Sequence, residues 1–184
     1  MFNPSHFSNS FPDGIGVLEI VGNGKPSRSE QAPRFVPLRR TQLRGQVLGP
    51  LASLCVRHSY GYSREQCDQV LEAVYRFPLP GDAAVTCVVV RFGEVEITAS
   101  LEERSRAESD YDEAVKAGWQ AALVTRESPD VFTLHVAGLQ PDQEVTVETR
   151  YVELARAEGT GWALRLPLTT APRYVRSRNS SPAR

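Results

Sequence analysis

Alternation of hydrophobic and polar residues is the main pattern in the first part of the chain. Residues 16–21 place Val17, Glu19 and Val21 on one side of an extended segment, and the glycines at 22 and 24 end it. Residues 41–48 and 51–62 follow as two further strand candidates, joined by the turn signal Gly49-Pro50. The pattern therefore predicts three early strands, the last two separated by a turn.

The same period continues through the middle of the chain. Leu71, Ala73, Tyr75 and Phe77 line one face of the next predicted strand, which prolines at 78 and 80 terminate. Residues 85–92 are almost continuously apolar, as in a strand buried on both faces, and residues 95–99 alternate after Gly93. Strand patterns return later at residues 121–125, 131–136, 144–154 and 162–166.

One segment has the period of a helix instead. Ala107, Tyr111, Ala114 and Val115 stand at i, i+4, i+7 and i+8, which places them on one helical face. Ser105 and Glu108 have the spacing of a capping box, and Gly118 stands where a left-handed C-cap is expected. We predict a helix over residues 105–117 that buries Tyr111 and Val115 against a sheet.

Ten strand-like runs around a single helix indicate the fold class. Repeated parallel βαβ units are excluded because they need several helices. The sequence predicts a mainly β protein, an antiparallel β-sandwich with one amphipathic α-helix packed on it.

Length and composition indicate how many domains the chain can form. The 184 residues allow one domain of ordinary size, and Leu, Ile, Val and Phe make up 46 of them. We expect a flexible arm over residues 1–13, one domain over 14–175 and a flexible tail over 176–184.

With 21 basic and 22 acidic residues, the charge does not favour nucleic acid or a membrane surface as a partner. No signal peptide or spanning segment is recognisable, so we expect a cytoplasmic protein.

Nucleophilic chemistry has little support in the sequence. Cys55, Cys67 and Cys87 form no CxxC pair, which excludes a zinc ribbon or a thioredoxin-type site. Cys55 and His58 are three residues apart, so in a strand their side chains point to opposite faces. A pairing of cysteine and histidine across strands, with His58 or His135, stays open. The glycine-rich segments at residues 14–16 and 22–25 do not complete a nucleotide-binding motif. The sequence also lacks the G-x-S-x-G motif that presents a nucleophilic serine.

Carboxylates gather around the predicted helix, where paired acids could act as general acid and base or bind a hard cation. They are Glu102, Glu103, Glu108, Asp110, Asp112 and Glu113. Arginines at 104 and 106 interleave with them, and Asp110 and Asp112 diverge around a helix. A solvated helix face explains the run better, so we assign no catalytic, cofactor-binding or metal-binding residue.

Several segments in a fixed order resemble one known family. They are 77–85 (FPLPGDAAV), 111–115 (YDEAV) with Gly118, 121–123 (AAL), 129–132 (PDVF), 138–139 with Pro141, 166–167 (LP) and 171–174 (APRY). Together they resemble the vault protein inter-alpha-trypsin (VIT) domain over residues 14–175. The segments at 16–18 and 36–38 are most similar to the intracellular members of the von Willebrand A domain-containing protein 5A type.

The resemblance implies a β-sandwich with one helix and no established catalytic residues. It also implies a following von Willebrand A domain, whose metal site is built on D-x-S-x-S, a pattern that this chain lacks. The motif residues have structural roles as turn, cap and core positions: Phe77, Pro78, Pro80, Tyr111, Val115, Gly118, Pro129, Phe132 and Pro172. Arg173 and Tyr174 are the candidates for contact with a partner.

Two functional hypotheses follow from these observations. The first is a non-catalytic protein-interaction or scaffold module, the N-terminal part of a VIT–von Willebrand A type protein, which binds a protein partner or the adjacent von Willebrand A domain. The alternative is a hydrolase-like enzyme that uses the acidic helix region or a cross-strand Cys–His pair. An enzyme needs polar groups that converge in a pocket, so the geometry of those groups discriminates between the two hypotheses.

Overall fold

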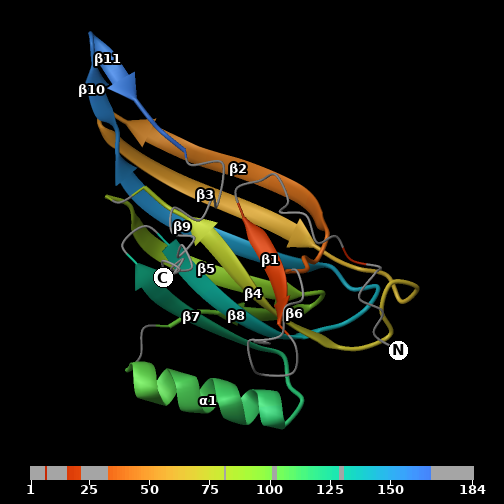
Figure 1. Cartoon of the computed structure of the whole chain (residues 1–184). Coiled ribbons are helices and arrows are strands. Elements are labelled where there is room, and N and C mark those ends of the chain that lie inside the picture. Colours follow the sequence, from red (N-terminus) through yellow and green to blue (C-terminus); the bar gives the residue numbers. More distant parts are fainter. Residues whose placement is uncertain are drawn as a thin grey trace, which may run out of the picture.

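The chain folds as two antiparallel β-sheets that face each other, with one helix outside them (Figure 1). The computed structural model describes residues 7, 16–21, 33–80, 82–100, 103–128 and 131–166. The elements are β1 (Val17–Val21), β2 (Leu38–Leu48), β3 (Leu51–Tyr60), β4 (Leu71–Pro78), β5 (Ala84–Phe92), β6 (Val95–Thr98), α1 (Arg104–Lys116), β7 (Ala121–Ser128), β8 (Val131–Leu139), β9 (Val145–Leu154), β10 (Arg156–Glu158) and β11 (Gly161–Ala163). The prediction of a mainly β sandwich with one helix is confirmed.

The two sheets differ in size. The smaller has the strand order β1-β4-β8-β7, and the larger has the order β2-β3-β9-β5-β6. The chain continues beyond β9 into the short hairpin β10–β11, which projects from the end of the larger sheet (Figure 1). Sheet neighbours such as β3 and β9 come from distant parts of the sequence, so the sandwich is held together by long-range pairing.

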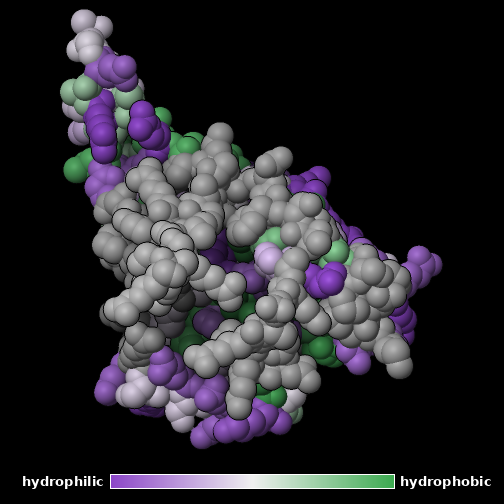
Figure 2. Space-filling model, viewed as in Figure 1, coloured by the Kyte–Doolittle hydropathy of each residue, from purple (hydrophilic) through white to green (hydrophobic). Residues whose placement is uncertain are grey.

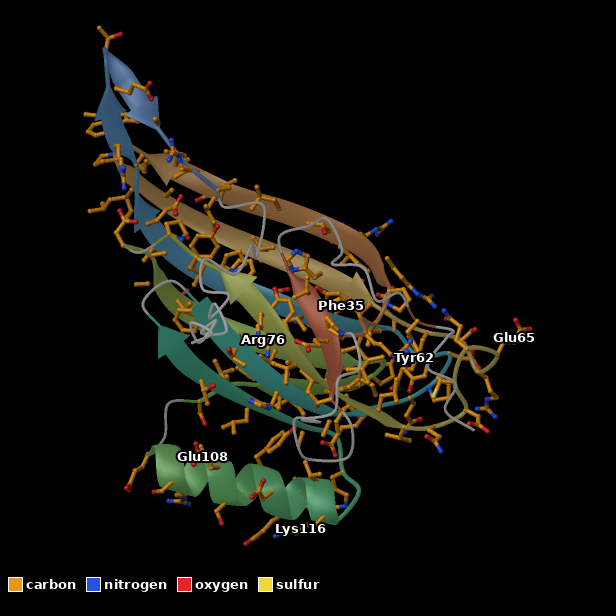
Figure 3. The ribbon with its side chains drawn as sticks, viewed as in Figure 1. Phe35, Tyr62, Glu65, Arg76, Glu108 and Lys116 are labelled. Carbon is orange, nitrogen blue, oxygen red and sulfur yellow. The ribbon has the colours of Figure 1, made fainter. Side chains whose placement is uncertain are left out.

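The core lies between the facing surfaces of the two sheets. Inward residues of β3 at 52, 54, 56 and 58 pack against inward residues of β4 at 71, 73, 75 and 77, and all of them are buried. Rings fill the centre: Tyr75 stacks on Phe77 at 6.1 Å, and Tyr151 of β9 approaches Phe77 at the same distance. At the end opposite the β10–β11 hairpin (Figure 3), the Tyr62 hydroxyl lies 2.6 Å from the Leu139 carbonyl oxygen. The alternation in the sequence therefore identified the inward face of β4.

Strand β5 differs from the prediction of a strand buried on both faces. Only residues 88–90 and Phe92 are buried, whereas Ala84 and Thr86 are exposed. The first half of β5 lies at the margin of the core, where little covers the sheet. The prediction from the apolar run, that the whole strand is buried on both faces, is therefore wrong for the first half of β5.

The helix begins one residue earlier than predicted and lacks the predicted capping box. Glu103 is the N-cap and makes no side-chain cap, while Ser105 lies in the first turn and donates to Glu103 Oε1 at 3.1 Å. The C-terminal prediction is confirmed: Gly118 has φ 74° and its N–H donates to the Val115 carbonyl oxygen. The Trp119 N–H donates to the Ala114 carbonyl oxygen at 2.9 Å, which completes a Schellman motif.

The helix covers the sheet less completely than expected. It packs beside β7, at the edge of the smaller sheet (Figure 1). Tyr111 and Val115 are half-buried, not buried, and the Tyr111 ring meets the His135 ring of β8 edge-to-face at 6.3 Å. A helix at a sheet margin shields only one side of its apolar face, which explains the difference.

The predicted terminal segments fall mostly outside the described residues, so the proposed boundaries at 14 and 175 stay predictions. Phe7 is the one described residue of the predicted arm, and its side chain is buried. Its ring meets that of Tyr62 edge-to-face at 5.9 Å. This contact ties one point of the segment to the core.

Candidate functional site

His58, the histidine that a hydrolase would need, is sealed in the core between the two sheets. Its Nδ1 lies 2.9 Å from the Tyr75 hydroxyl oxygen, and its Nε2 has no hydrogen-bond partner among the described residues. Burial lowers the pKa of His58 to about 4, so the ring is neutral at pH 7. Because the ring is fully buried, it has no solvent path along which a substrate could approach.

Gly16 shows how tightly this histidine is enclosed. A Cβ atom at Gly16 would lie 2.7 Å from Tyr75 Cε2 and 3.1 Å from His58 Cε1. The Tyr60 hydroxyl donates to the Gly16 carbonyl oxygen at 3.0 Å, which fixes the backbone at this point. The close packing leaves no room for a ligand at the ring.

The three cysteines do not meet His58. Cys55 points to the opposite face of β3, as the sequence spacing predicted. Cys87 is opposite Arg150 on the same outer face, and Cys67 is buried next to Gln69. All three thiols are free. The cross-strand Cys–His pair that the sequence left open is therefore not formed by His58.

A carboxylate surrounded by arginines occupies the outer face of the larger sheet. Glu148 lies on the central strand β9, and its side chain is only 1% exposed. Arg57 of β3 donates from Nε to Glu148 Oε2 at 3.0 Å, and Arg150 donates from Nε to Oε1 at 2.8 Å. Arg91 of β5 adds a third contact at 3.3 Å. Both carboxylate oxygens are thereby engaged by guanidinium groups.

The electrostatics of this cluster keep Glu148 ionised. Burial alone would raise the pKa of Glu148, but the hydrogen bonds and positive charges of Arg57 and Arg150 outweigh it and lower the pKa to about 2. A carboxylate with such a low pKa is a poor general acid or base at neutral pH. The cluster ties three strands together and offers no free group for catalysis.

The acidic region of the helix does not converge on a site either. Asp110 lies 3.9 Å from Arg106 on the exposed helix surface, and Asp112 and Glu113 are exposed. Within the described part of the chain, no three His, Cys, Asp or Glu residues are placed to hold a metal ion. Glu102 lies outside the described residues. The helix carboxylates are arranged as separate surface charges. Figure 3 labels Glu108 and Lys116 on this helix.

Exposed apolar side chains gather where the larger sheet meets the projecting hairpin. We call this surface the apolar end, and it consists of Leu48, Leu51, Leu154 and Trp162. Val47 is also exposed, but it pairs with the inward Ala52 and therefore lies on the other face of β2. Leu48 pairs with Leu51 and Leu51 with Leu154, so these three form one row across β2, β3 and β9. Leu48 is 82% exposed and Trp162 is 53% exposed. Figure 2 shows hydrophobic residues among hydrophilic ones in this region.

An unpaired carboxylate lies close to the apolar end. Glu153 is buried, and neither of its oxygens has a hydrogen-bond partner among the described residues. Burial, followed by the charge of Asp82, raises the pKa of Glu153. A buried acid without hydrogen-bond donors costs stability, so Glu153 is an unfavourable feature of this end of the sheet.

A hollow lies between the helix end and the smaller sheet. It has a volume of about 170 Å³ and is lined by β1, the start of β4 and the turn after α1. Val115 and Gly118, two of the family-motif residues, contribute to its wall, as does the exposed Trp119. Glu72 is the single charged residue among the described residues of its wall, so charged groups do not converge there.

The other motif residues have simple locations in the fold. Phe77 is in the core, Pro78 ends β4, Pro80 follows it and Phe132 is packed partly against the core. Pro129, Pro172, Arg173 and Tyr174 lie outside the described residues. The sequence analysis did not single out the apolar end or the Glu148 cluster. The leucines that flank Gly49-Pro50 were the available signal for the former, but residues 57, 91 and 148 show no local pattern.

Comparisons with known proteins agree with the sequence resemblance. The family model described as the vault protein inter-alpha-trypsin domain matches residues 38–151. The chain is 38% identical over 115 residues to the von Willebrand factor A domain-containing protein 5A of Rattus norvegicus. The matched region covers 60% of this chain and 14% of the rat protein. The human protein of the same name is 36% identical over 114 residues.

A relative with a different name matches more of the chain. The protein mono-ADP-ribosyltransferase PARP4 of Homo sapiens is 29% identical over 168 residues, which is 91% of this chain and 10% of that protein. The chain thus spans no more than about one seventh of these relatives' length. Among the described residues, no helix combines the length and apolar character needed to cross a membrane.

Proposed function

Because the chain belongs to the vault protein inter-alpha-trypsin domain family, we propose that it is a non-catalytic protein-interaction module that docks against a von Willebrand A domain. The apolar end is the observation that carries this proposal. Leu48, Leu51 and Leu154 form an exposed apolar row across the larger sheet, with the exposed Trp162 on the adjoining hairpin, and such patches mark protein contacts. The match to proteins named for a von Willebrand factor A domain suggests the partner.

The arrangement of polar groups supports a binding role over the hydrolase alternative. His58 is enclosed by aromatic rings, and Glu148 is held ionised by three arginines. The helix carboxylates lie apart from both. The mono-ADP-ribosyltransferase named among the relatives is about ten times longer than the matched segment, so its activity gives no reason to assign catalysis to these residues.

Two further parts of the proposal rest on the sequence. Arg173 and Tyr174, outside the described residues, are proposed to contribute to the same contact. We also propose a cytoplasmic location, which the three free thiols support because cytosolic proteins keep their cysteines reduced.

The test uses two purified proteins: this chain and the von Willebrand A domain encoded in the same natural polypeptide. Isothermal titration calorimetry is expected to detect binding, and changing Leu48 and Leu51 together to Ser should weaken it at least tenfold because both side chains would be buried on docking. A second variant, with Arg173 and Tyr174 changed together to Ala, is also expected to bind more weakly.

The matched control is Val70→Ser, which removes an exposed apolar side chain outside the apolar end. This variant should bind as the unchanged protein does. A natural polypeptide without a von Willebrand A domain, no measurable binding, or an equal loss in the control would refute the proposal.

A further inference from the structure

The strand β2 forms a long free edge of the larger sheet. It has 11 residues and pairs with β3 on one side, while no described strand lies on its other side. Between Gln31 and Arg64 the sequence contains six arginines and no acidic residue, although the whole chain has a net charge of −1. The free edge therefore belongs to a locally basic segment of a nearly neutral protein.

The two faces of β2 have different chemistry. Arg40, Gln42, Arg44 and Gln46 pair with outward residues of β3 and share the outer face of the sheet. Leu43 pairs with the inward Val56, yet it is 43% exposed because the core does not cover the edge. The edge thus has arginine and glutamine on one face, and on the other the exposed Leu43 and Val47, with Thr41 and Gly45 at the alternate positions.

We propose that this edge binds an extended segment of a partner protein, with alternating acidic and apolar residues, as an additional strand. A strand added to a sheet edge lies about 4.8 Å away, and side chains on the same face come within about 5 Å of each other. Acidic side chains of the segment would meet Arg40 and Arg44, and its apolar side chains would cover Leu43 and Val47. The inference rests on the proposed role as an interaction module and names the chemistry of a second contact.

Arg40 and Arg44 are available for such a contact. Neither forms an ion pair within the described part of the chain, whereas Arg57, Arg91 and Arg150 are already engaged by Glu148. Antiparallel pairing of two copies of β2 would bring the arginines of one copy opposite or diagonal to those of the other, which disfavours it. The charge of the edge therefore favours an acidic partner over an identical copy.

The opposite edge of the same sheet offers a comparison within the chain. Glu94 and Glu96 alternate with Val95 and Ile97 at β6, which is the pattern that β2 requires. However, β6 has only four residues, and Glu96 already accepts from Arg91 Nε at 2.8 Å. A separate partner segment fits the 11 residues of β2 better than the β6 edge of a second copy.

The experiment compares two capped peptides of equal composition with the whole chain. One is Glu-Val-Glu-Val-Glu-Val-Glu-Val-Glu, and the other carries the four valines in one block followed by the five glutamates. We expect only the alternating peptide to bind in an NMR titration and to slow amide hydrogen exchange in β2. Its affinity should fall several-fold at high salt because exposed charges are screened. Equal binding of both peptides, or no binding of either, would overturn the inference.

Variants connect the binding to the edge. Changing Arg40 and Arg44 together to Glu should lower the affinity for the alternating peptide at least fivefold. Changing Arg106, on the exposed helix surface, to Glu should leave that affinity unchanged. Circular dichroism establishes that both variants are folded. A peptide affinity unchanged in the double variant would overturn the inference, and so would self-association of the chain that is lost when Glu94 and Glu96 are changed to Gln. If the alternating peptide does not bind while the von Willebrand A domain still binds at the apolar end, only this inference is refuted. If neither the peptide nor the domain binds, the proposed function is refuted as well.

Discussion

Replacement of Glu148 by Gln tests the strongest electrostatic feature of the sheet. The substitution keeps the size of the side chain but removes the charge that three arginines surround. The folded-state pKa of about 2, compared with an ordinary value of 4.5, corresponds to about 3 kcal/mol of stability at pH 7, at about 1.4 kcal/mol per pH unit. We therefore expect E148Q to lower the free energy of unfolding by about 3 kcal/mol and the melting temperature by roughly 6–12 °C.

The pH dependence gives this prediction a second readout. Because the folded state lowers the pKa of Glu148, its contribution is fully present above about pH 4.5 and is lost as the pH falls toward 2. The unchanged protein should lose this stability in that window, and E148Q should not. Both tryptophans are exposed, so urea unfolding is better followed by circular dichroism than by fluorescence.

Glu96→Gln is the matched control for this experiment. Glu96 also pairs with Arg91, but its side chain is 51% exposed, and exposed pairs contribute at most about 1 kcal/mol. The control should therefore melt within a few degrees of the unchanged protein. An E148Q variant that is as stable as E96Q would refute the reasoning that burial and three guanidinium groups make the Glu148 cluster important.

Three further predictions concern other parts of the molecule. His58 has a folded-state pKa of about 4, below its ordinary 6.5, so stability should fall by about 3 kcal/mol as the pH drops from 6.5 to 4; denaturant titrations of His58→Gln should lack this loss. Tyr111→Ala should cost roughly 1–2 kcal/mol in a thermal melt, less than a fully buried aromatic, because its ring is half-buried; no change would mean that the helix face contributes nothing. Limited proteolysis should remove residues 176–184 without lowering the melting temperature, whereas removal of residues 1–13 should lower it slightly if Phe7 anchors that segment, a point that Phe7→Ala checks separately.

Much of the fold could be predicted because strand faces follow a local rule. Alternate residues of a strand point to the same side, so the apolar residues of β4 identified its inward face without knowledge of the partner strands. The left-handed position of Gly118 could be predicted for the same kind of reason, since few other residues adopt that conformation readily. The position of His58, two residues after Val56, was an available signal for its place on the inner face, but no such prediction was made from it.

The features that failed or were missed depend on non-local structure. Ser105 has the chemistry of an N-cap, but Glu103 takes that position without a side-chain cap, so the local capping preference did not determine where the helix begins. The Glu148 cluster requires the register between β3, β9 and β5, which brings residues 57 and 91 to one carboxylate across the sheet. No sequence period encodes that register.

The central position of β9 has a consequence for how the chain folds during synthesis. β9 lies between β3 and β5 in the larger sheet, but about 85 residues separate the end of β3 from its start. At a translation rate of about 5–20 residues per second, the β2–β3 hairpin waits roughly 4–17 seconds on the ribosome before β9 emerges. During that interval the edge of β3 that β9 later occupies is open to incorrect pairing, so slow-folding or chaperone-bound nascent chains should accumulate before residue 145 is made.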